Sequence, residues 1–244
     1  MHQTAVFLQV ALNGDRIHPA APRTPAAIAA AALAARDAGA HSVHVHAFDQ
    51  AGNETLDSAS CAAVLGAIRA LCPATPVSLT TSATIEPDPA KRHQLVAAWE
   101  VLPHLVTANQ GEPGIVPLCH LLLSCGVEIE AGLLTAGDAR AFVRSGLAER
   151  CRRVLIEPLD EDPASAVQHA AAMDDVLRSA GVTLPRVYHG YGIACWAVNQ
   201  YGLAQGHGIR TGLEDVTVLP DGAPAPDNAS LVAAAGRLIR ASQK

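Results

Sequence analysis

Two histidines, His44 and His46, stand two positions apart in a run of residues, 42–47, that favours a β-strand. Residues i and i+2 share one face of a strand, so both imidazoles point to the same side. Burying two polar rings without partners is costly, and a divalent metal ion bound by neutral imidazoles would satisfy both. Two core histidines with hydrogen-bond partners would also be satisfied, so the pair alone leaves both interpretations open.

A second candidate group lies near the other end of the chain. Arg210, Gly212 and Glu214 share one face of a predicted strand over residues 209–213, and Glu214 comes at its carboxyl end. Glu214 could complete a His-His-carboxylate set with positions left open for substrate, which is the arrangement of a catalytic metal site. Asp215 could then act as a base beside the metal. Alternatively, Arg210 and Asp215 form a structural ion pair.

These residues must be positioned by the elements around them. Short β-rich runs alternate with Ala-rich amphipathic stretches, a pattern typical of βα units around a parallel sheet. The predicted strands cover residues 5–12, 42–47, 77–81, 105–108, 127–131, 153–156, 186–189 and 209–213. About eight such units indicate a single-domain (β/α)8 TIM barrel over residues 1–244, whose active site lies at the carboxyl ends of the strands. A doubly wound sheet is the alternative, because local patterns do not show closure.

Capping residues in the sequence also predict where helices begin and end. Thr24 and Pro25 predict the start of a helix over residues 26–37, and Gly39 predicts its end. Three further residues are predicted to cap later helices in the same way: Asp88, Thr135 and Asp227.

The composition narrows the class of partner. The chain has 244 residues, half of them hydrophobic, which suffices for a sizeable core without disulfides. Its net charge of -6 comes without any run of like charges, so small molecules are expected as partners rather than nucleic acid or a membrane. The six cysteines contain no C-x-x-C pair and are interpreted as buried hydrophobes. With no signal peptide or membrane span recognisable, a cytoplasmic location is expected.

The lysines exclude two enzyme classes. Lys91, on a predicted surface helix, and the final residue Lys244 are the only ones. Schiff-base aldolases and pyridoxal-phosphate enzymes need a lysine amine at the reacting carbon. Carbon–carbon chemistry would therefore need another electron sink.

Taken together, the motifs resemble those of the β-keto acid cleavage enzymes, the family of 3-keto-5-aminohexanoate cleavage enzyme. The resemblance extends over nearly the whole chain. The matching segments are residues 11–14 (Ala-Leu-Asn-Gly), His44-Val45-His46 with Asp49 and Gly52, 107–109 (Thr-Ala-Asn), 127–130 (Val-Glu-Ile-Glu), Trp196, 210–215 (Arg-Thr-Gly-Leu-Glu-Asp) and 227–229 (Asp-Asn-Ala). The segment 210–215 is the most specific.

The resemblance implies a zinc-dependent TIM barrel that takes a β-keto acid and acetyl-CoA and yields acetoacetate and a new acyl-CoA. By the same resemblance, His44, His46 and Glu214 would bind Zn²⁺, and Asp215, assisted by Arg210, would be the catalytic base. The metal would polarise the carbonyl as a Lewis acid, which supplies the electron sink. The resemblance further implies a homotetramer.

Other positions are matched less closely. Thr80 aligns with a catalytic hydroxyl of the family, although its turn lacks the family's two glycines. Residues expected on the substrate side are Asn13, Thr107, Asn109 and Glu130. Each also has a structural interpretation, since hydroxyls at strand ends often cap loops and a carboxylate can be paired at the rim.

Two departures from the family pattern bear on the substrate. Arg16 stands where the 5-amino enzyme has a glutamate that meets the substrate's amino group. A guanidinium there would repel an ammonium, so a neutral or acidic tail is predicted. Phe48 replaces a family arginine and places an apolar ring near the metal loop. Arg16 could instead be a surface residue of the loop over residues 15–23.

Two other functions compete with acyl transfer. Zinc amidohydrolase barrels also use H-x-H, but on the first strand and with histidines on strands five and six, where this chain offers Glu130 and Glu157. A non-catalytic metal-binding barrel is the other alternative, and the intact Arg210, Glu214 and Asp215 argue against it. The sequence contains no recognisable CoA-binding motif.

Overall fold

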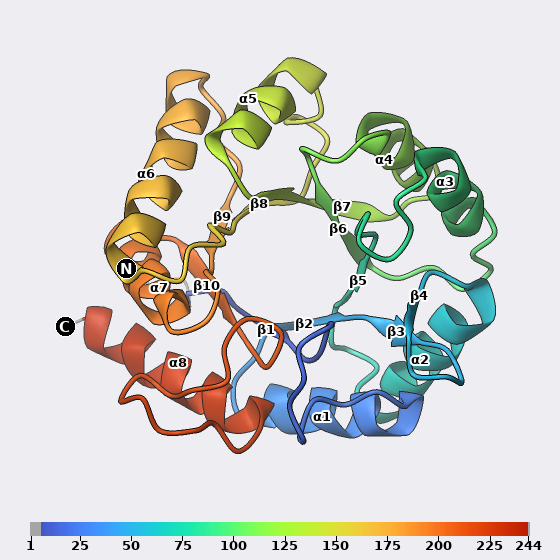
Figure 1. Ribbon diagram of the computed structural model, residues 1–244, viewed down its shortest axis with the longest axis horizontal. Coiled ribbons are helices and arrows are strands. Elements are labelled where there is room, and N and C mark those ends of the chain that lie inside the picture. Colours follow the sequence, from blue (N-terminus) through green and yellow to red (C-terminus); the bar gives the residue numbers. More distant parts are fainter. Residues whose placement is uncertain (1–5, 244) are drawn as a thin grey trace.

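The computed structural model describes residues 6–243, which form a closed barrel of parallel strands ringed by helices (Figure 1). Around the barrel the strand order is β1-β10-β9-β8-β7-β6-β5-β2. Register pairs Val10 of β1 with Thr211 of β10 on one side and with Val43 of β2 on the other. Closure confirms the predicted (β/α)8 TIM barrel and excludes the open doubly wound sheet.

Each of the eight predicted strands is present, with ends that differ by a few residues. The barrel strands are β1 Leu8–Ala11, β2 Ser42–Val45, β5 Val77–Thr80, β6 Leu105–Asn109, β7 Glu128–Leu133, β8 Arg153–Ile156, β9 Arg186–Tyr188 and β10 Gly208–Thr211. The predicted first strand began at Ala5, which lies outside the described residues. His46 and Glu214 both fall beyond the last residue of their strands, so loop geometry decides where they point.

The helices surround the barrel as an outer layer, and their bounds are α1 Pro25–Asp37, α2 Ser58–Leu71, α3 Pro89–Ala97, α4 Ile115–Ser124, α5 Ala136–Ser145, α6 Pro163–Ser179, α7 Ala194–Ala204 and α8 Asn228–Ser242. The predicted caps are confirmed: the Thr24 hydroxyl accepts from the amide of Ala27, and Asp88, Thr135 and Asp227 each accept from a first-turn amide. These contacts satisfy amide groups that otherwise lack a partner at a helix start.

A small hairpin after β2 was not predicted. Its strands are β3 Ala47–Phe48 and β4 Glu54–Thr55, which pair antiparallel. Gly52 turns the connection with φ of +83°, a conformation that favours glycine. The hairpin carries Glu54 back over the carboxyl end of β2, beside the histidines.

The core lies between the barrel and its helices, where aliphatic side chains such as Ile28, Leu65 and Leu177 are fully buried. Five of the six cysteines belong to this layer, but Cys125 is exposed at the end of α4, so its predicted burial is wrong. Lys91 lies on α3, pairs with Glu86 and does not line the cavity at the barrel mouth, whereas Lys244 is outside the described residues. Among residues 6–243, no helix has the length and apolar character needed to cross a membrane.

Candidate active site and metal centre

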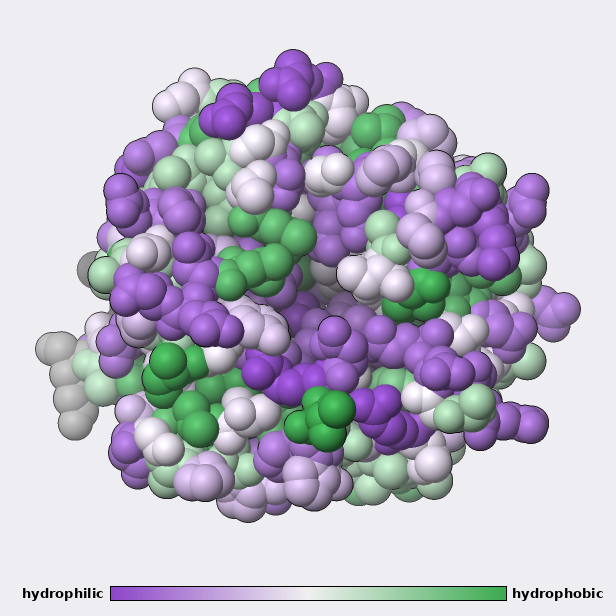
Figure 2. Space-filling model, in the orientation of Figure 1, coloured by the Kyte–Doolittle hydropathy of each residue, from purple (hydrophilic) through white to green (hydrophobic). Residues whose placement is uncertain are grey.

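The barrel opens at the carboxyl ends of its strands into a cavity of about 200 Å³, called here the central cavity. Figure 2 shows a hollow at the centre of one face of the molecule. The central cavity is lined by residues from strand ends and from the loops that follow them: Gly14, Asp15, His44, His46, Glu54, Thr80, Ser82, Thr84, Thr107, Asn109, Leu134, Glu157, Leu159, Tyr191, Arg210 and Glu214.

His44, His46 and Glu214 converge in this cavity. One ligand atom from each lies within 4.8 Å of the others. Nε2 of His44 is 3.6 Å and Nε2 of His46 is 3.5 Å from the same oxygen, Oε2 of Glu214. In the closed barrel only β1 lies between β2 and β10. Two chain segments that are about 170 positions apart are therefore brought together.

Two glycines, Gly212 and Gly14, stand where a larger side chain would collide with atoms around Glu214. A Cβ at Gly212 would lie 2.0 Å from the carbonyl oxygen of Ala11, and Gly212 has φ of +147°. A Cβ at Gly14 would lie 2.8 Å from Cγ of Glu214. Asn228 ties the same loops together, since it accepts from the amide of Leu213 and donates to the carbonyl of Leu12. The glycines and the asparagine of the family motifs therefore place the Glu214 carboxylate.

The Nδ1 atoms of both histidines face away from Glu214 and have partners of their own. Nδ1 of His46 lies 2.6 Å from Oε1 of Glu54. Nδ1 of His44 lies 3.2 Å from the hydroxyl of Thr107 and 3.4 Å from that of Ser78. Partners of this kind fix the orientation and tautomer of metal-binding histidines.

Burial and charge act differently on the two rings. Burial lowers the pKa of His44 to about 3, so this imidazole is neutral at physiological pH. Burial also acts to lower the pKa of His46, but the carboxylates of Glu214 and Glu54 outweigh it and raise that pKa to about 10. Burial opposes ionisation of Glu214, yet Arg210 and the two histidines hold its pKa well below the usual range.

The geometry of these three residues fits a divalent cation. Two ligands about 2.05 Å from a tetrahedral zinc ion are about 3.3 Å apart, and the two nitrogens lie 3.5 and 3.6 Å from the Glu214 oxygen, beyond hydrogen-bonding length. That oxygen is buried and has no hydrogen-bond partner among the described residues. Two imidazoles and a carboxylate are also a donor set that zinc accepts.

Arg210 binds both acidic residues that follow β10. It donates through Nε and Nη2 to the two oxygens of Asp215, at 3.1 and 2.8 Å, and through Nη2 to Oε1 of Glu214 at 2.6 Å. Burial opposes ionisation of Asp215, but Arg210 and His189 lower its pKa. Asp215 is only 2% exposed and is not among the described residues that line the central cavity.

A second histidine–carboxylate cluster adjoins the first. His189 is fully buried, with Nδ1 3.5 Å from Oδ1 of Asp215 and Nε2 3.6 Å from Oε2 of Glu157. Glu157 lines the central cavity, and burial raises its pKa. A carboxyl at the cavity wall is thereby connected through one imidazole to the carboxylate of Asp215.

The structure places the predicted substrate residues in different environments. Thr80, Thr107 and Asn109 line the central cavity, whereas Asn13 and Glu130 do not. Asn13 accepts from the amide of His46 and donates to its carbonyl, so it fixes the backbone of a metal-ligand candidate. Glu130 is fully buried inside the barrel.

Arg16 does not line the central cavity either. Its Nε donates to the carbonyl of Glu214 and its Nη2 to that of Asp215, and its guanidinium stacks 4.2 Å from the ring centre of Tyr191. Arg16 therefore holds the loop after β10, and the argument that its charge faces the substrate tail is not supported by this geometry. Phe48 is buried beneath Arg23 rather than exposed to the cavity.

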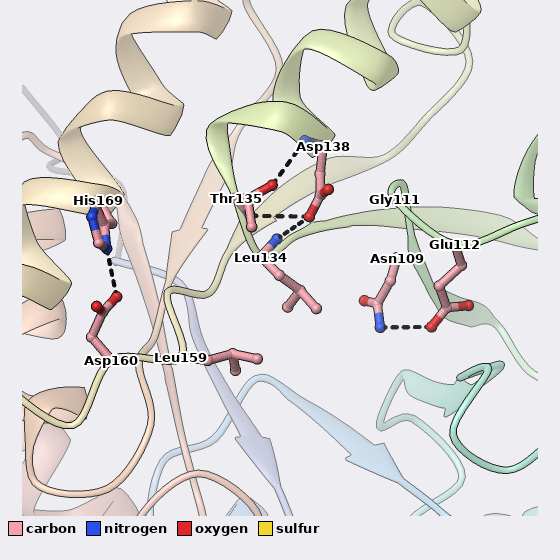
Figure 3. A pocket seen from close by; sticks show the side chains of 9 residues that line it. All are labelled: Asn109, Gly111, Glu112, Leu134, Thr135, Asp138, Leu159, Asp160 and His169. Atoms are coloured by element: carbon pink, nitrogen blue, oxygen red, sulfur yellow. Dashed lines mark hydrogen bonds and ion pairs between the residues drawn. The ribbon is translucent and has the colours of Figure 1, made fainter.

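A larger adjoining cavity of about 590 Å³ shares Asn109, Leu134 and Leu159 with the central cavity. Its remaining lining residues are Gly111, Glu112, Thr135, Asp138, Asp160 and His169. Figure 3 shows the two leucines projecting between the Asp160–His169 pair on one side and the Asn109–Glu112 pair on the other.

Sequence reasoning missed several residues of this site. Glu157 and His189 come at the carboxyl ends of β8 and β9, so the rule that selects polar residues at strand ends would have found both. Glu54 could have been found only by recognising the hairpin around Gly52. Ser78 lies within β5 and carries no signal of its own.

Fold and site together define a TIM barrel with a candidate metal centre of two histidines and a carboxylate at its catalytic end. A family model described as beta-keto acid cleavage enzyme matches residues 5–244. The chain belongs to this family, which confirms the resemblance read from its motifs. A comparison with curated proteins found no match.

Solved structures of ObcA share the fold. The apo structure has a TM-score of 0.75 at 17% identity and covers 92% of this chain and 63% of that one. A ternary complex of ObcA with a C4-CoA adduct and oxalate has a TM-score of 0.75 at 16% identity, with 92% and 65% covered. A binary complex of ObcA with oxaloacetate has a TM-score of 0.71 at 16% identity, with 92% and 64% covered. The chain thus spans less than two thirds of the length of these proteins.

Proposed function

We propose that this protein is a zinc-dependent β-keto acid cleavage enzyme that condenses a β-keto acid with acetyl-CoA and releases acetoacetate and a new acyl-CoA. The observation that carries the proposal is the convergence of His44, His46 and Glu214 beside the Arg210–Asp215 pair, in a chain that belongs to this family. The ObcA complexes with a CoA adduct and with oxaloacetate support a CoA thioester and a keto acid as partners. Assembly as a homotetramer and a cytoplasmic location stay predictions.

His44, His46 and Glu214 would hold the metal ion. When bound there, it would act as a Lewis acid that polarises the ketone of the substrate and stabilises developing negative charge. The neutral His44 can offer a lone pair without losing a proton. Arg210 places a buried positive charge on the same side of the cavity and holds the oxygens of Glu214 and Asp215 in place.

Asp215 would take a proton from the methylene between the ketone and the carboxylate, which forms the enolate. The enolate carbon would attack the thioester carbonyl of acetyl-CoA, form a carbon–carbon bond and expel the CoA thiolate. The thiolate would then attack the original ketone carbon, and cleavage of the original carbon–carbon bond would leave the acyl group on CoA and release the enolate of acetoacetate. That enolate would take back the proton held by Asp215, which gives acetoacetate and restores the base. Thr80, at the cavity wall, is positioned as a hydroxyl donor to developing negative charge.

The substrate tail would extend from the central cavity into the adjoining one, since the two share three lining residues. The carboxylates of the adjoining cavity already have partners: Glu112 pairs with Arg92, Asp138 accepts from backbone amides, and Asp160 pairs with His169. The described residues of the cavity thus offer an acidic tail no free cation, and the pairs of Glu112 and Asp160 leave fewer carboxylates to bind a cationic tail. Within the predicted neutral or acidic class, a neutral tail fits best.

The test is a turnover assay with zinc-loaded protein, acetyl-CoA and β-keto acids that carry neutral, acidic or cationic tails, read by mass spectrometry for new acyl-CoA. Neutral tails should give the fastest turnover, and Asp215→Asn should lower turnover of each of them by at least about 10²-fold. Turnover of only cationic tails would reject the proposed tail class but keep the reaction. No product from any tail, with metal bound, would favour the hydrolase or the non-catalytic barrel.

A further inference from the structure

Glu130 was expected to contact substrate, but it lies within the barrel below the central cavity. It is fully buried on β7, where its register partners are Thr107, which lines the central cavity, and Arg153. Its Oε1 accepts from Nε2 of Gln9 at 2.8 Å and from Nε of Arg153 at 2.7 Å. Two donors, one of them the guanidinium of Arg153, thus already occupy Oε1.

The other oxygen of Glu130 faces Thr107. The Thr107 hydroxyl donates to Oε2 of Glu130 at 3.4 Å, and the same hydroxyl oxygen lies 3.2 Å from Nδ1 of His44. A hydroxyl has one proton to donate. Since the Thr107 proton is donated to Glu130, the Thr107 oxygen is left to accept from Nδ1 of His44.

The direction of this chain of contacts decides the tautomer of the imidazole. In a neutral histidine, a proton on Nδ1 leaves a lone pair on Nε2. Nε2 of His44 is the atom that faces Glu214 in the candidate metal centre. We propose that Glu130, acting through the Thr107 hydroxyl, is a positioning residue that fixes the metal-binding tautomer of His44.

This inference rests on the proposed metal site but not on the proposed reaction. It also separates the two ligand histidines. His46 has a carboxylate, Glu54, directly on Nδ1, whereas His44 reaches Glu130 through one hydroxyl. Ser78 also lies within 3.4 Å of His44 Nδ1 and 3.3 Å from the Thr107 hydroxyl, so it shares the contact but has no carboxylate of its own.

The experiment measures Zn²⁺ affinity by competition with a chelator, in metal-depleted wild type and variants. Thr107→Val removes the hydroxyl with little change of shape and should weaken zinc binding by roughly 10–100-fold, the usual cost of losing an outer partner. Thr107→Ser should restore an affinity near wild type, and Glu130→Gln should weaken binding because its amide can donate to Thr107. Thr211→Val is the matched control: Thr211 is buried on β10 and its hydroxyl has no hydrogen-bond partner within residues 6–243.

A second readout follows the tautomer itself. Nitrogen-15 NMR of histidine-labelled, metal-free protein, with the ring of His44 assigned from a His44→Gln variant, should show the proton on Nδ1 in wild type and Thr107→Ser. Thr107→Val should lose that preference, while Thr211→Val keeps it. A merely structural role for Thr107 would not move this signal in a folded variant.

Three results would overturn the inference: unchanged zinc affinity in folded Thr107→Val, equal weakening by Thr107→Ser and Thr107→Val, or a proton on Nε2 of His44 in wild type. A wild type that binds no zinc would overturn it too. Zinc binding with the expected pattern, but without turnover of β-keto acids, would keep this inference and reject the proposed reaction.

Discussion

Two histidine–carboxylate clusters meet at Arg210, and they differ in what lies behind the imidazoles. In the cluster of His44, His46 and Glu214, each ring has a partner on Nδ1, so both Nε2 atoms are directed to one carboxylate oxygen. In the cluster of Glu157, His189 and Asp215, the two nitrogens of a single ring face two different carboxylates.

The contact distances do not separate the clusters, since all four lie between 3.5 and 3.6 Å. The oxygens do. Oε2 of Glu214 is buried without a hydrogen-bond partner among the described residues, while both oxygens of Asp215 accept from Arg210. The first cluster, with two imidazoles directed to an oxygen that has no other partner, is therefore suited to a metal ion, whereas in the second Arg210 holds the carboxylate of Asp215. The clusters also differ in composition, since the first has two imidazoles and one carboxylate and the second has one imidazole and two carboxylates.

The largest expected effect follows from removing a ligand of the first cluster. His46→Ala should abolish zinc retention and lower turnover by roughly 10³-fold or more, because Lewis-acid stabilisation is worth several kcal/mol. Zinc content by mass spectrometry and kcat measured on the same preparations check this. His189→Gln, the matched change in the second cluster, should retain zinc. Equal zinc loss in both variants would remove the distinction between the clusters.

A smaller effect is expected from the proposed base. Asp215→Asn should lower kcat by about 10²–10⁴-fold, the usual contribution of general base catalysis, with zinc still bound. Glu157→Gln is the comparison, since Glu157 lines the central cavity and Asp215 does not. If Glu157→Gln causes the greater loss of kcat, the base would be Glu157, and Asp215 would serve to orient His189.

The smallest effect concerns the imidazole between the two carboxylates. His189→Gln should lower kcat by about fivefold, because His189 lowers the pKa of Asp215 and loss of that electrostatic contact would cost about 1 kcal/mol. KM for the β-keto acid should stay close to that of wild type, because His189 is buried and does not line the central cavity among the described residues. Separate measurement of kcat and KM checks this, and a change confined to KM would contradict it.

Much of the fold was readable from local patterns. The alternation of β-rich and Ala-rich runs predicted every barrel strand, and Thr24 with Pro25 predicted the start of α1. The hairpin of β3 and β4 escaped prediction because each of its strands has only two residues, too few to show a period.

The site was only partly predictable. The spacing of His44 and His46 and the position of Glu214 after β10 led to the candidate metal centre. The direction of long side chains was not predictable: Arg16 turns to the carbonyls of Glu214 and Asp215, and Glu130 points into the barrel rather than the cavity. A flexible side chain follows the partners that surround it, and those partners come from distant parts of the chain.

The sequence by itself determined the family, the repeated βα units and the residue types that can bind a metal ion, because each of these depends on local periodicity or on a short motif. The tertiary structure alone decided which oxygen of Glu214 is left without a partner, which nitrogen of His44 faces it, and that Glu130 acts from behind Thr107. These features depend on closure of the barrel, which brings side chains from β1, β2, β6 and β7 within hydrogen-bonding distance and places Glu214, after β10, beside the two histidines.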